Sequence, residues 1–382
     1  MANHIRTGFT LPVGYYKFHR KQLFNFQLNR WHSLGYARFE DMLRAGRVIK
    51  DFASWKTEMI RLAEEAETDN RLMNAAFYYR AAEFYILKET EEKRELYDKF
   101  IDLFDRAFRD DSIERFEVPY QGTYLPTMKV VPSDIKKGTV VIHGGFDSFI
   151  EEFYSWMAYL AEAGYEIIAF EGPGQGGARR KYDLAFDYEW EKPVADILDF
   201  FTLDDVTLLG ISMGGWLCLR AAAFEPRITR VIANGHAHDY MQCMPPFLWN
   251  IHKIFFNHLR GWSNKMTLKK IEQGRSMDAW FAAQLMYISK KEMPLDAFDT
   301  FIALCEENLC PELVKQDVLI LSGRKDHFIP NKMHRKQLDV LTNAKSVTGR
   351  VFTKDEHAQN HCQIGNVGLA LEVMVDWIRE VS

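Results

Sequence analysis

The hydrophobic positions of residues 1–112 recur with helical spacing. Apolar side chains fall three and four residues apart over 51–66, 70–88 and 90–109, and few glycines or prolines interrupt these segments. The stretch also holds many aromatic residues, which we expect mainly in a core, although some could instead line a pocket over the rest of the chain. We therefore predict a helical N-terminal domain over residues 1–112 with a lid or pocket-forming role.

From about residue 113 the pattern changes to strands that alternate with helices. Residues 116–120 and 124–131 flank Gln-Gly-Thr and predict a hairpin. The strands expected after it are 139–143, 165–170, 206–210, 229–233, 318–321 and 346–352, and the helices are 149–163, 190–201, 216–224, 331–341 and 365–381. Strands separated by helices indicate a parallel sheet with right-handed crossovers. The predicted fold class is α/β, with a doubly wound, mostly parallel sheet.

One long segment, 236–312, interrupts this alternation. It is helical in pattern and rich in Met, Trp and Phe. The segment follows the carboxyl end of a strand, where open α/β sheets bind their ligands. We predict that it is a helical cap inserted into a catalytic domain of residues 113–382.

Composition narrows the choice of partners. The chain has 382 residues, 47% hydrophobic and 26% charged, with a net charge of −5 and scattered basic residues, which argues against a nucleic-acid partner. No apolar run is long enough to span a membrane, and the N-terminus lacks a secretory pattern. The five cysteines lack metal-ligand spacing and are expected as free thiols in a reducing cytoplasm. A content of 14% aromatic residues indicates extra aromatic surface, which suits a small apolar or aromatic ligand.

The sharpest chemical signal is Gly210-Ile211-Ser212-Met213-Gly214, between an expected strand and an expected helix. G-x-S-x-G in this setting is a nucleophile elbow, because glycines at both ends allow a tight turn that projects the serine hydroxyl. The N-terminus of the following helix offers N–H groups to a developing oxyanion. Ser212 is the predicted nucleophile.

A serine nucleophile needs a base and an orienting acid, here expected in the chain order Ser, Asp or Glu, His. Asp326 lies in the loop after strand 318–321 and fits the acid, whereas Glu306 and Glu307 precede that strand. Two histidines, His357 and His361, lie after the last strand. We favour His361 because it is nearer the final helix, although position alone leaves His357 open.

The loop His143-Gly144-Gly145-Phe146 follows the first crossover strand, where this arrangement takes its second oxyanion donor. We predict the backbone amides of Phe146 and Met213 as donors, and His143 as a residue that braces the loop.

Further polar residues lie close to the predicted site. Glu171, in Glu-Gly-Pro-Gly-Gln-Gly, is either a buried structural acid or a group facing the substrate. His236, His238 and Asp239 follow the fourth crossover strand, but a metal there would lack further ligands. We therefore predict neither a metal nor a cofactor.

Together these features resemble the α/β-hydrolase superfamily over about residues 113–382. The motifs HGGFDS, EGPGQG, GISMGG, GRKDHFIP and HCQ, after a helical domain, look like the branch of 2,6-dihydropseudooxynicotine hydrolase and of enzymes that shorten polyketide chains by C–C cleavage. The resemblance implies Ser212 as nucleophile, Asp326 as acid and His361, in HCQ, as base, and a possible homodimer. Glu171 and Asp239 are candidates for the additional acid that some relatives use.

The expected reaction is retro-Claisen cleavage of a C–C bond beside a carbonyl in a bulky aromatic or polyketide-like substrate. The alternatives are a carboxylesterase with the same triad and, from another class, a ligand-binding protein on a hydrolase scaffold. All three triad members are present in order, which argues against the last.

Overall fold

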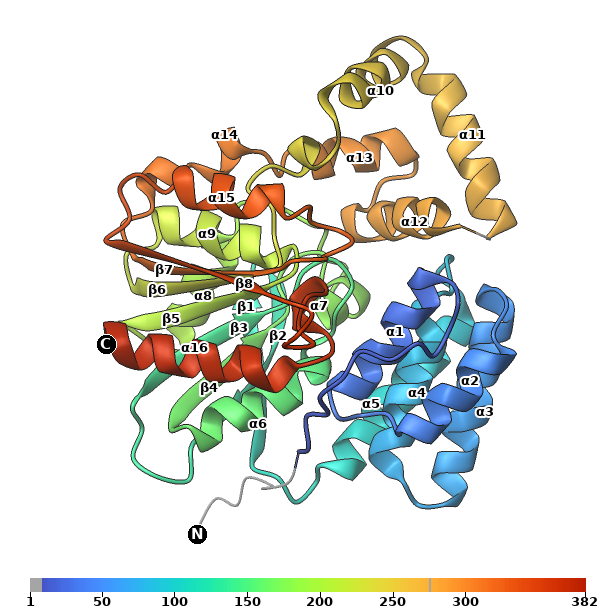
Figure 1. The fold of residues 1–382 in the computed structure, drawn as a ribbon, viewed down its shortest axis with the longest axis horizontal. Coiled ribbons are helices and arrows are strands. Elements are labelled where there is room, and N and C mark those ends of the chain that lie inside the picture. Colours follow the sequence, from blue (N-terminus) through green and yellow to red (C-terminus); the bar gives the residue numbers. More distant parts are fainter. Residues whose placement is uncertain (1–8, 275) are drawn as a thin grey trace.

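The computed structural model describes residues 9–274 and 276–382 of the chain (Figure 1). Within these ranges the strands are β1 (Ile113–Tyr120), β2 (Thr123–Val130), β3 (Gly138–His143), β4 (Tyr165–Phe170), β5 (Val206–Ile211), β6 (Ile228–Asn234), β7 (Asp317–Gly323) and β8 (Ser346–Phe352). They form one sheet in the order β1-β2-β4-β3-β5-β6-β7-β8. The pairs β1–β2 and β2–β4 are antiparallel and the others are parallel. The predicted mostly parallel sheet and its opening hairpin are confirmed.

Helices cover both faces of this sheet. One face packs against α6 (Tyr154–Glu162) and α16 (Val367–Val381), and the other against α8 (Glu191–Phe201), α9 (Gly214–Phe224) and α15 (Lys332–Asp339). In β3, Val140 and Ile142 join the first core, whereas Val141 joins the second. Since successive side chains of a strand point to opposite faces, both sets are apolar, which explains the short continuous apolar runs in the sequence.

The N-terminal part of the chain forms a helical region beside the sheet (Figure 1). Its helices are α1 (Gln22–Ser33), α2 (Phe39–Val48), α3 (Phe52–Thr68), α4 (Leu72–Phe84) and α5 (Glu91–Ala107). Helical periodicity located α3, α4 and α5 but missed α1 and α2. For α1 the reason is that it is buried nearly all round, polar residues included, so no polar stripe marks its outer face. Asn29, for example, is satisfied inside by bonds to the backbone N–H and C=O of Tyr16.

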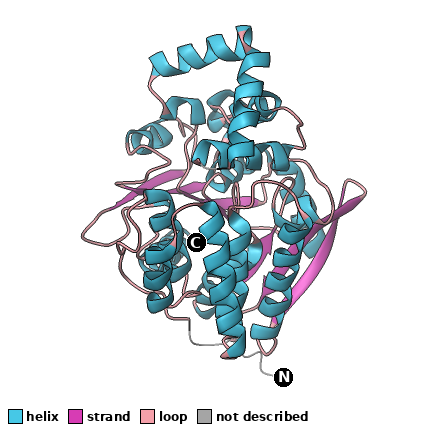
Figure 2. Ribbon diagram, turned by 90° about the vertical axis from the view of Figure 1, so that its right-hand side faces the viewer, coloured by secondary structure: helices cyan, strands magenta, loops and turns pink. Residues whose placement is uncertain are grey.

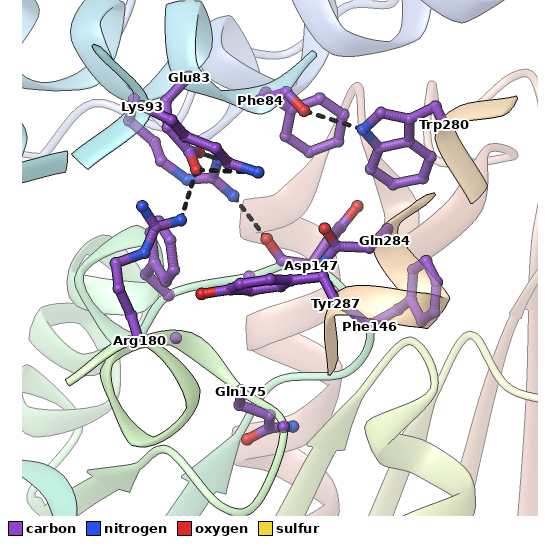
Figure 3. A pocket seen from close by; sticks show the side chains of 15 residues that line it. Glu83, Phe84, Lys93, Phe146, Asp147, Gln175, Arg180, Trp280, Gln284 and Tyr287 are labelled. Atoms are coloured by element: carbon purple, nitrogen blue, oxygen red, sulfur yellow. Dashed lines mark hydrogen bonds and ion pairs between the residues drawn. The ribbon is translucent and has the colours of Figure 1, made fainter. Parts of the chain in front are cut away.

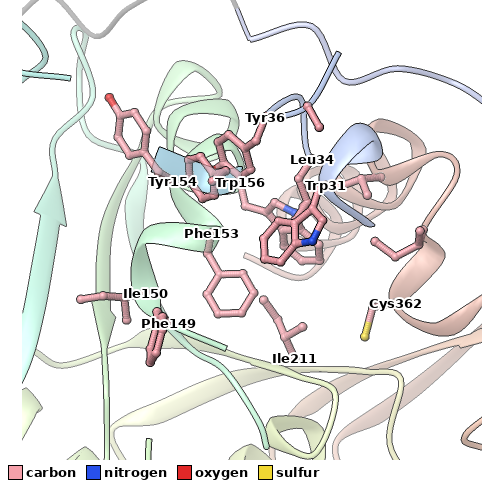
Figure 4. Close-up of a cluster of buried hydrophobic side chains, with 14 of the residues drawn as sticks. Trp31, Leu34, Tyr36, Phe149, Ile150, Phe153, Tyr154, Trp156, Ile211 and Cys362 are labelled. Carbon is pink, nitrogen blue, oxygen red and sulfur yellow. The ribbon is translucent and has the colours of Figure 1, made fainter. Parts of the chain in front are cut away.

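An apolar core joins the helical region to the sheet. Figure 4 shows Trp31, Leu34 and Tyr36 beside Phe153 and Trp156, which come from the 3₁₀ helix η1 (Ile150–Phe153) and from α6. The backbone N–H of Ser155 donates to the Tyr36 hydroxyl at 2.8 Å. The helical region is therefore packed on the sheet through a continuous core.

Buried charges cross the same boundary. The Arg80 guanidinium contacts Glu83 at 2.6 Å and Glu152 at 2.8 Å, and Arg180 contacts Glu83 at 2.6 Å. Burial alone would raise the pKa of Glu83, but Arg180, Lys93 and Arg80 outweigh it and lower that pKa to about 2. Because these charges are buried, removal of one would leave its partners uncompensated.

The segment between β6 and β7 is helical. It comprises η2 (Tyr240–Cys243), α10 (Pro246–His258), α11 (Arg260–Gln273), α12 (Met277–Ser289), α13 (Pro294–Ile302), α14 (Glu306–Leu309) and η3 (Pro311–Leu313). Trp280 of α12 donates to the Phe84 carbonyl at 2.8 Å, and the two rings stack with centroids 5.0 Å apart. The insertion thus contacts the N-terminal helices, whereas α10 and α11 project away from the body (Figures 1 and 2).

Candidate active site

Ser212 lies in a tight turn between β5 and α9. Its backbone has a φ of 60°, which lies in the left-handed region that is unfavourable for residues other than glycine. Its N–H donates to the Asn234 carbonyl at 2.8 Å. The flanking glycines are required sterically. A Cβ on Gly210 would lie 1.9 Å from the Gly214 oxygen, and one on Gly214 would lie 2.4 Å from the Gly144 oxygen. The strained turn therefore needs both glycines to hold the serine hydroxyl at the end of the strand.

The structure brings Ser212, His361 and Asp326 into one hydrogen-bonded chain. His361 Nε2 lies 2.9 Å from Ser212 Oγ, and His361 Nδ1 lies 2.7 Å from Asp326 Oδ2. The other carboxylate oxygen, Oδ1, accepts from the N–H groups of Phe328 and Ile329 at 2.8 and 2.9 Å. Asp326 is thus oriented from one side and orients the imidazole from the other.

His361 belongs to a short 3₁₀ turn, η4 (His361–Gln363), before α16. Burial alone would lower the pKa of His361, but the Asp326 carboxylate dominates among the opposing interactions and the pKa is raised well above its ordinary value. The Phe328 ring and the imidazole pack in a T-shaped arrangement, with centroids 5.0 Å apart and an interplanar angle of 79°. His357, the alternative that sequence position left open, is exposed and does not line the cavity described below.

The loop that carries one predicted oxyanion donor touches the turn that carries the other. A Cβ on Gly145 would lie 2.7 Å from the Met213 nitrogen, so the loop after β3 touches the serine turn. Neither the Phe146 amide nor the Met213 amide donates to another of the described residues. His143 is fully buried, and burial lowers its pKa to about 4, so it is a neutral ring below this loop.

The Gly-rich run after β4 supports the same loop. Gln175 Nε2 donates to the carbonyls of Gly144 and Gly145 at 2.7 and 3.1 Å. Glu171 is buried, and its two oxygens accept from the N–H groups of Ile150 and Gly177. The sequence motif gave no reason to single out Gln175, whose role appears only when the two loops are seen in contact.

The two acidic candidates for substrate binding lie away from the cavity wall. Glu171 is not among the cavity-lining residues, and burial, followed by the charge of Glu151, raises its pKa to about 8. Asp239 is not among them either, since its carboxylate caps η2 by accepting from the N–H groups of Met241 and Gln242. Among the described residues no group of three His, Cys, Asp or Glu side chains is placed to hold a metal.

Ser212 and His361 open into a cavity of about 630 Å³. Its wall is mainly aromatic and aliphatic and comes from three parts of the chain: Phe26 and Leu34 from the N-terminal region, Phe153 and Trp156 beside the sheet, and Tyr240, Met241, Phe256, Phe281, Phe298 and Phe301 from the insertion. Of the N-terminal aromatics, most are core residues, but Phe26 lines this cavity. A cavity of this size and composition suits a bulky, flat, apolar ligand.

One stretch of the cavity wall is charged. Arg30, Asp147, Ser148 and Glu152 line it, with Arg30 2.5 Å from Glu152 and 3.6 Å from Asp147. Nothing in the sequence of α1 distinguishes Arg30 from a surface arginine, so its place in the cavity wall becomes clear only when the helix is seen packed on the sheet.

A second cavity of about 30 Å³ lies behind this wall, with Phe146, Asp147, Ser148 and Trp280 shared between the two (Figure 3). It has room for water. Its remaining polar wall comes from Arg80, Glu83, Lys93, Gln175, Arg180, Gln284 and Tyr287. Gln284, from the insertion, donates to the Phe146 carbonyl at 3.1 Å, so the predicted oxyanion loop is held from this side as well.

Among the described residues, no helix has both the length and the apolar content needed to cross a membrane.

The sequence of the chain is similar to known proteins. The sequence pattern of the alpha/beta hydrolase family matches residues 139–347. Hydrolase LUC6 of Fusarium sp is 33% identical over 342 residues, which cover 81% of this chain and 80% of that protein. The 20-hydroxy-prefusarin hydrolase FUS2 of Gibberella moniliformis is 32% identical over 231 residues, but only 51% of this chain and 55% of FUS2 are covered.

The arrangement of the whole chain also has a solved counterpart. The crystal structure of the 2,6-dihydroxy-pseudo-oxynicotine hydrolase superposes with a TM-score of 0.65 over 92% of this chain and 95% of that one, at 22% identity. This similarity extends to the part of the chain that precedes residue 139, where the family pattern begins.

Proposed function

The chain belongs to the α/β-hydrolase family, and from that premise we propose that it is a serine hydrolase that cleaves a C–C bond beside a ketone carbonyl. The observation that carries the proposal is the chain Asp326–His361–Ser212, which opens into a large aromatic cavity. One relative supports this choice of reaction: 2,6-dihydropseudooxynicotine hydrolase of Paenarthrobacter nicotinovorans is 28% identical over 187 residues, which cover 47% of this chain and 50% of that protein.

In the first half of the proposed reaction Ser212 is acylated. His361 Nε2 takes the hydroxyl proton while Nδ1–H donates to Asp326, and Oγ attacks the ketone carbonyl carbon. The carbonyl π electrons move onto oxygen, and the amides of Phe146 and Met213 hold the resulting oxyanion. Each such donor is typically worth about 10²–10³ in rate.

Collapse of this intermediate breaks the C–C bond. The bonding pair leaves as an enolate that a second carbonyl group stabilises, and the imidazolium of His361 returns its proton to that carbon. A water molecule, deprotonated by His361, then attacks the acyl carbon and releases Ser212 and a carboxylic acid. No other reactant is required.

The cavity favours one substrate class within this chemistry. C–C cleavage requires a delocalised leaving group, so it suits aromatic ketones and polyketide-like β-dicarbonyl compounds. We propose that the apolar walls hold the carbon skeleton and that the Arg30 wall faces the carbonyl-rich end. In this interpretation residues 1–112 and the insertion of about 236–312 serve as lid and cap on a catalytic domain of residues 113–382.

The test is a paired assay on purified protein. The kcat/KM of aryl β-diketones is compared with that of aryl esters of graded acyl size, with Ser212→Ala as the blank. Dominant diketone cleavage that Ser212→Ala abolishes would support the proposal, whereas ester cleavage alone would assign a carboxylesterase with the same residues.

A matched histidine pair tests the base in the same assay. Asparagine tolerates the left-handed backbone of His357 (φ 58°), so His357→Asn and His361→Asn are comparable substitutions. Only His361→Asn should abolish cleavage. Equal losses in the two variants would contradict the assignment of His361.

A further inference from the structure

The helices α10 and α11 expose an unusual amount of apolar surface. Of the sixteen large apolar side chains that are exposed among the described residues, seven fall in this short segment: Phe247, Leu248, Ile251, Ile254, Leu259, Trp262 and Met266. Figures 1 and 2 show the two helices projecting from the rest of the molecule. Exposed apolar side chains concentrated in one projecting segment are typical of an interaction site.

Three of the exposed apolar residues of α10 share one face of the helix. Phe247, Ile251 and Ile254 are spaced by four and three residues, and they are 64%, 45% and 56% exposed. His252 and Phe256, on the opposite face, line the large cavity. The exposed apolar residues of α10 are therefore separate from the residues with which this helix lines the cavity.

Basic residues accompany this apolar face. The helices α10 and α11 together contain five Lys and Arg residues and one Glu, a net charge of +4, within a chain of net charge −5. Part of this charge is offset by neighbouring acids, since Arg260 contacts both Asp296 and Asp299 and Lys270 lies 3.9 Å from Asp278. Lys265 and Lys269 are exposed on the same side of α11 as Trp262 and Met266, by helical spacing.

Apolar side chains at the tip, a tryptophan among them, with lysines beside them are the pattern of a helix that lies in the interface of an anionic membrane. A second copy of the chain fits this face less well, because a two-fold contact would oppose two surfaces of the same positive charge.

We propose that the face formed by α10 and α11 docks on the surface of a lipid bilayer that contains anionic lipids. The apolar side chains enter the headgroup boundary, and the lysines pair with lipid phosphates and carboxylates. The cavity lies directly behind α10, so, resting on the function proposed above, an apolar substrate dissolved in the lipid would reach Ser212 from this side.

The test is flotation of the full-length protein with two kinds of vesicle, phosphatidylcholine alone and phosphatidylcholine with phosphatidylserine. The protein should float with the anionic vesicles, much less with the neutral ones, and added salt should weaken the binding. Ile254→Asp should abolish it. Lys269→Gln should lower the partition coefficient about fivefold, since a lysine near an anionic surface contributes about 1 kcal/mol.

Ile135→Asp is the matched control. Ile135 is 88% exposed and precedes two lysines, but it lies in a loop on another part of the molecule. The Ile135→Asp variant should therefore bind the anionic vesicles as the wild type does. Hydrolysis of a water-soluble ester should be unchanged in Ile254→Asp and Lys269→Gln, which separates loss of docking from loss of the active site.

Three results would overturn the proposal. These are absence of flotation with anionic vesicles, binding that Ile254→Asp and Ile135→Asp reduce equally, and a dimer in light scattering that Ile254→Asp dissociates without any vesicle binding. The last result would assign the face to a second copy of the chain.

Discussion

Replacement of Asp326 by asparagine tests the hydrogen-bonded chain at its most constrained member. In the wild type Oδ1 accepts two backbone N–H groups and Oδ2 accepts His361 Nδ1–H. The side chain of asparagine has one acceptor oxygen, whereas that of aspartate has two. If its oxygen keeps the two backbone donors, its NH₂ group faces His361, which must then carry its proton on Nε2 and cannot accept the proton of Ser212.

The opposite orientation of the amide is costly. It would point the NH₂ group at the N–H groups of Phe328 and Ile329 and leave both without an acceptor. At about 1–3 kcal/mol for each unsatisfied donor, this costs at least about 2 kcal/mol, or about 30-fold in the population of the productive form. Loss of the carboxylate charge that stabilises the imidazolium adds to this, so we expect kcat to fall about 10⁴-fold, or about 5 kcal/mol.

The pH profile gives a second readout. Activity requires neutral His361, so kcat/KM rises with pH through the raised pKa of that residue. Without the Asp326 charge, burial, which lowers the pKa, is no longer outweighed, and the acid limb should move to lower pH. Asp355→Asn, at an exposed position in the loop before His361, is the control. A loss of kcat smaller than about 30-fold, or an unmoved acid limb, would refute the reasoning.

Three further predictions follow from single contacts. Gln175→Leu removes the two hydrogen bonds from Gln175 to the Gly144 and Gly145 carbonyls, so kcat for ester hydrolysis should fall by up to about 10²-fold with little change in KM. Gly210→Ala forces a Cβ against the Gly214 oxygen and should lower the free energy of unfolding in urea by about 1–3 kcal/mol or more, whereas Gly261→Ala, where a Cβ meets nothing within 4 Å, should not. Glu83 has a folded-state pKa of about 2 against an ordinary 4.5, so its contribution to stability is present above pH 4.5 and is lost as the pH falls toward 2. The Glu83→Gln variant should therefore be less stable than the wild type at pH 6, and the difference in stability should shrink on acidification.

Each of these predictions has a result that contradicts it. A Gln175→Leu variant that changes KM but not kcat would mean that the loop is held without Gln175. Equal urea midpoints for Gly210→Ala and Gly261→Ala would mean that the elbow relaxes freely. A constant difference in stability between wild type and Glu83→Gln from pH 6 to pH 3 would mean that the Glu83 charge is not stabilised by its partners.

Much of the fold could be predicted because it depends on local chemistry. A buried parallel strand needs apolar side chains on both faces, so β3 to β7 stand out as short apolar runs. The elbow at Ser212 needs glycine on both sides for steric reasons that a short stretch of sequence contains. By contrast, α1 was missed because its polar residues are buried by segments distant in sequence.

In the candidate site, too, some residues could be predicted from the local sequence and others depended on the tertiary structure. The G-x-S-x-G turn predicted Ser212 and chain order predicted Asp326, but position left two histidines. The three-dimensional path of the loop after β8 is what brings His361 to Ser212 and leaves His357 exposed. The roles of these residues in catalysis stay predictions until the variants are measured.

What the sequence determined by itself is the set of elements, their order and the residues capable of the chemistry, since periodicity and tight turns are encoded within a few neighbouring positions. Only the tertiary structure decided that Phe26 and Arg30 of α1 face the cavity and that Gln175 holds the loop of Gly144 and Gly145. It also decided that α10 presents an apolar stripe to solvent. These are contacts, or the lack of them, between segments that are far apart along the chain, and burial by a distant segment leaves no mark on the local pattern of residues.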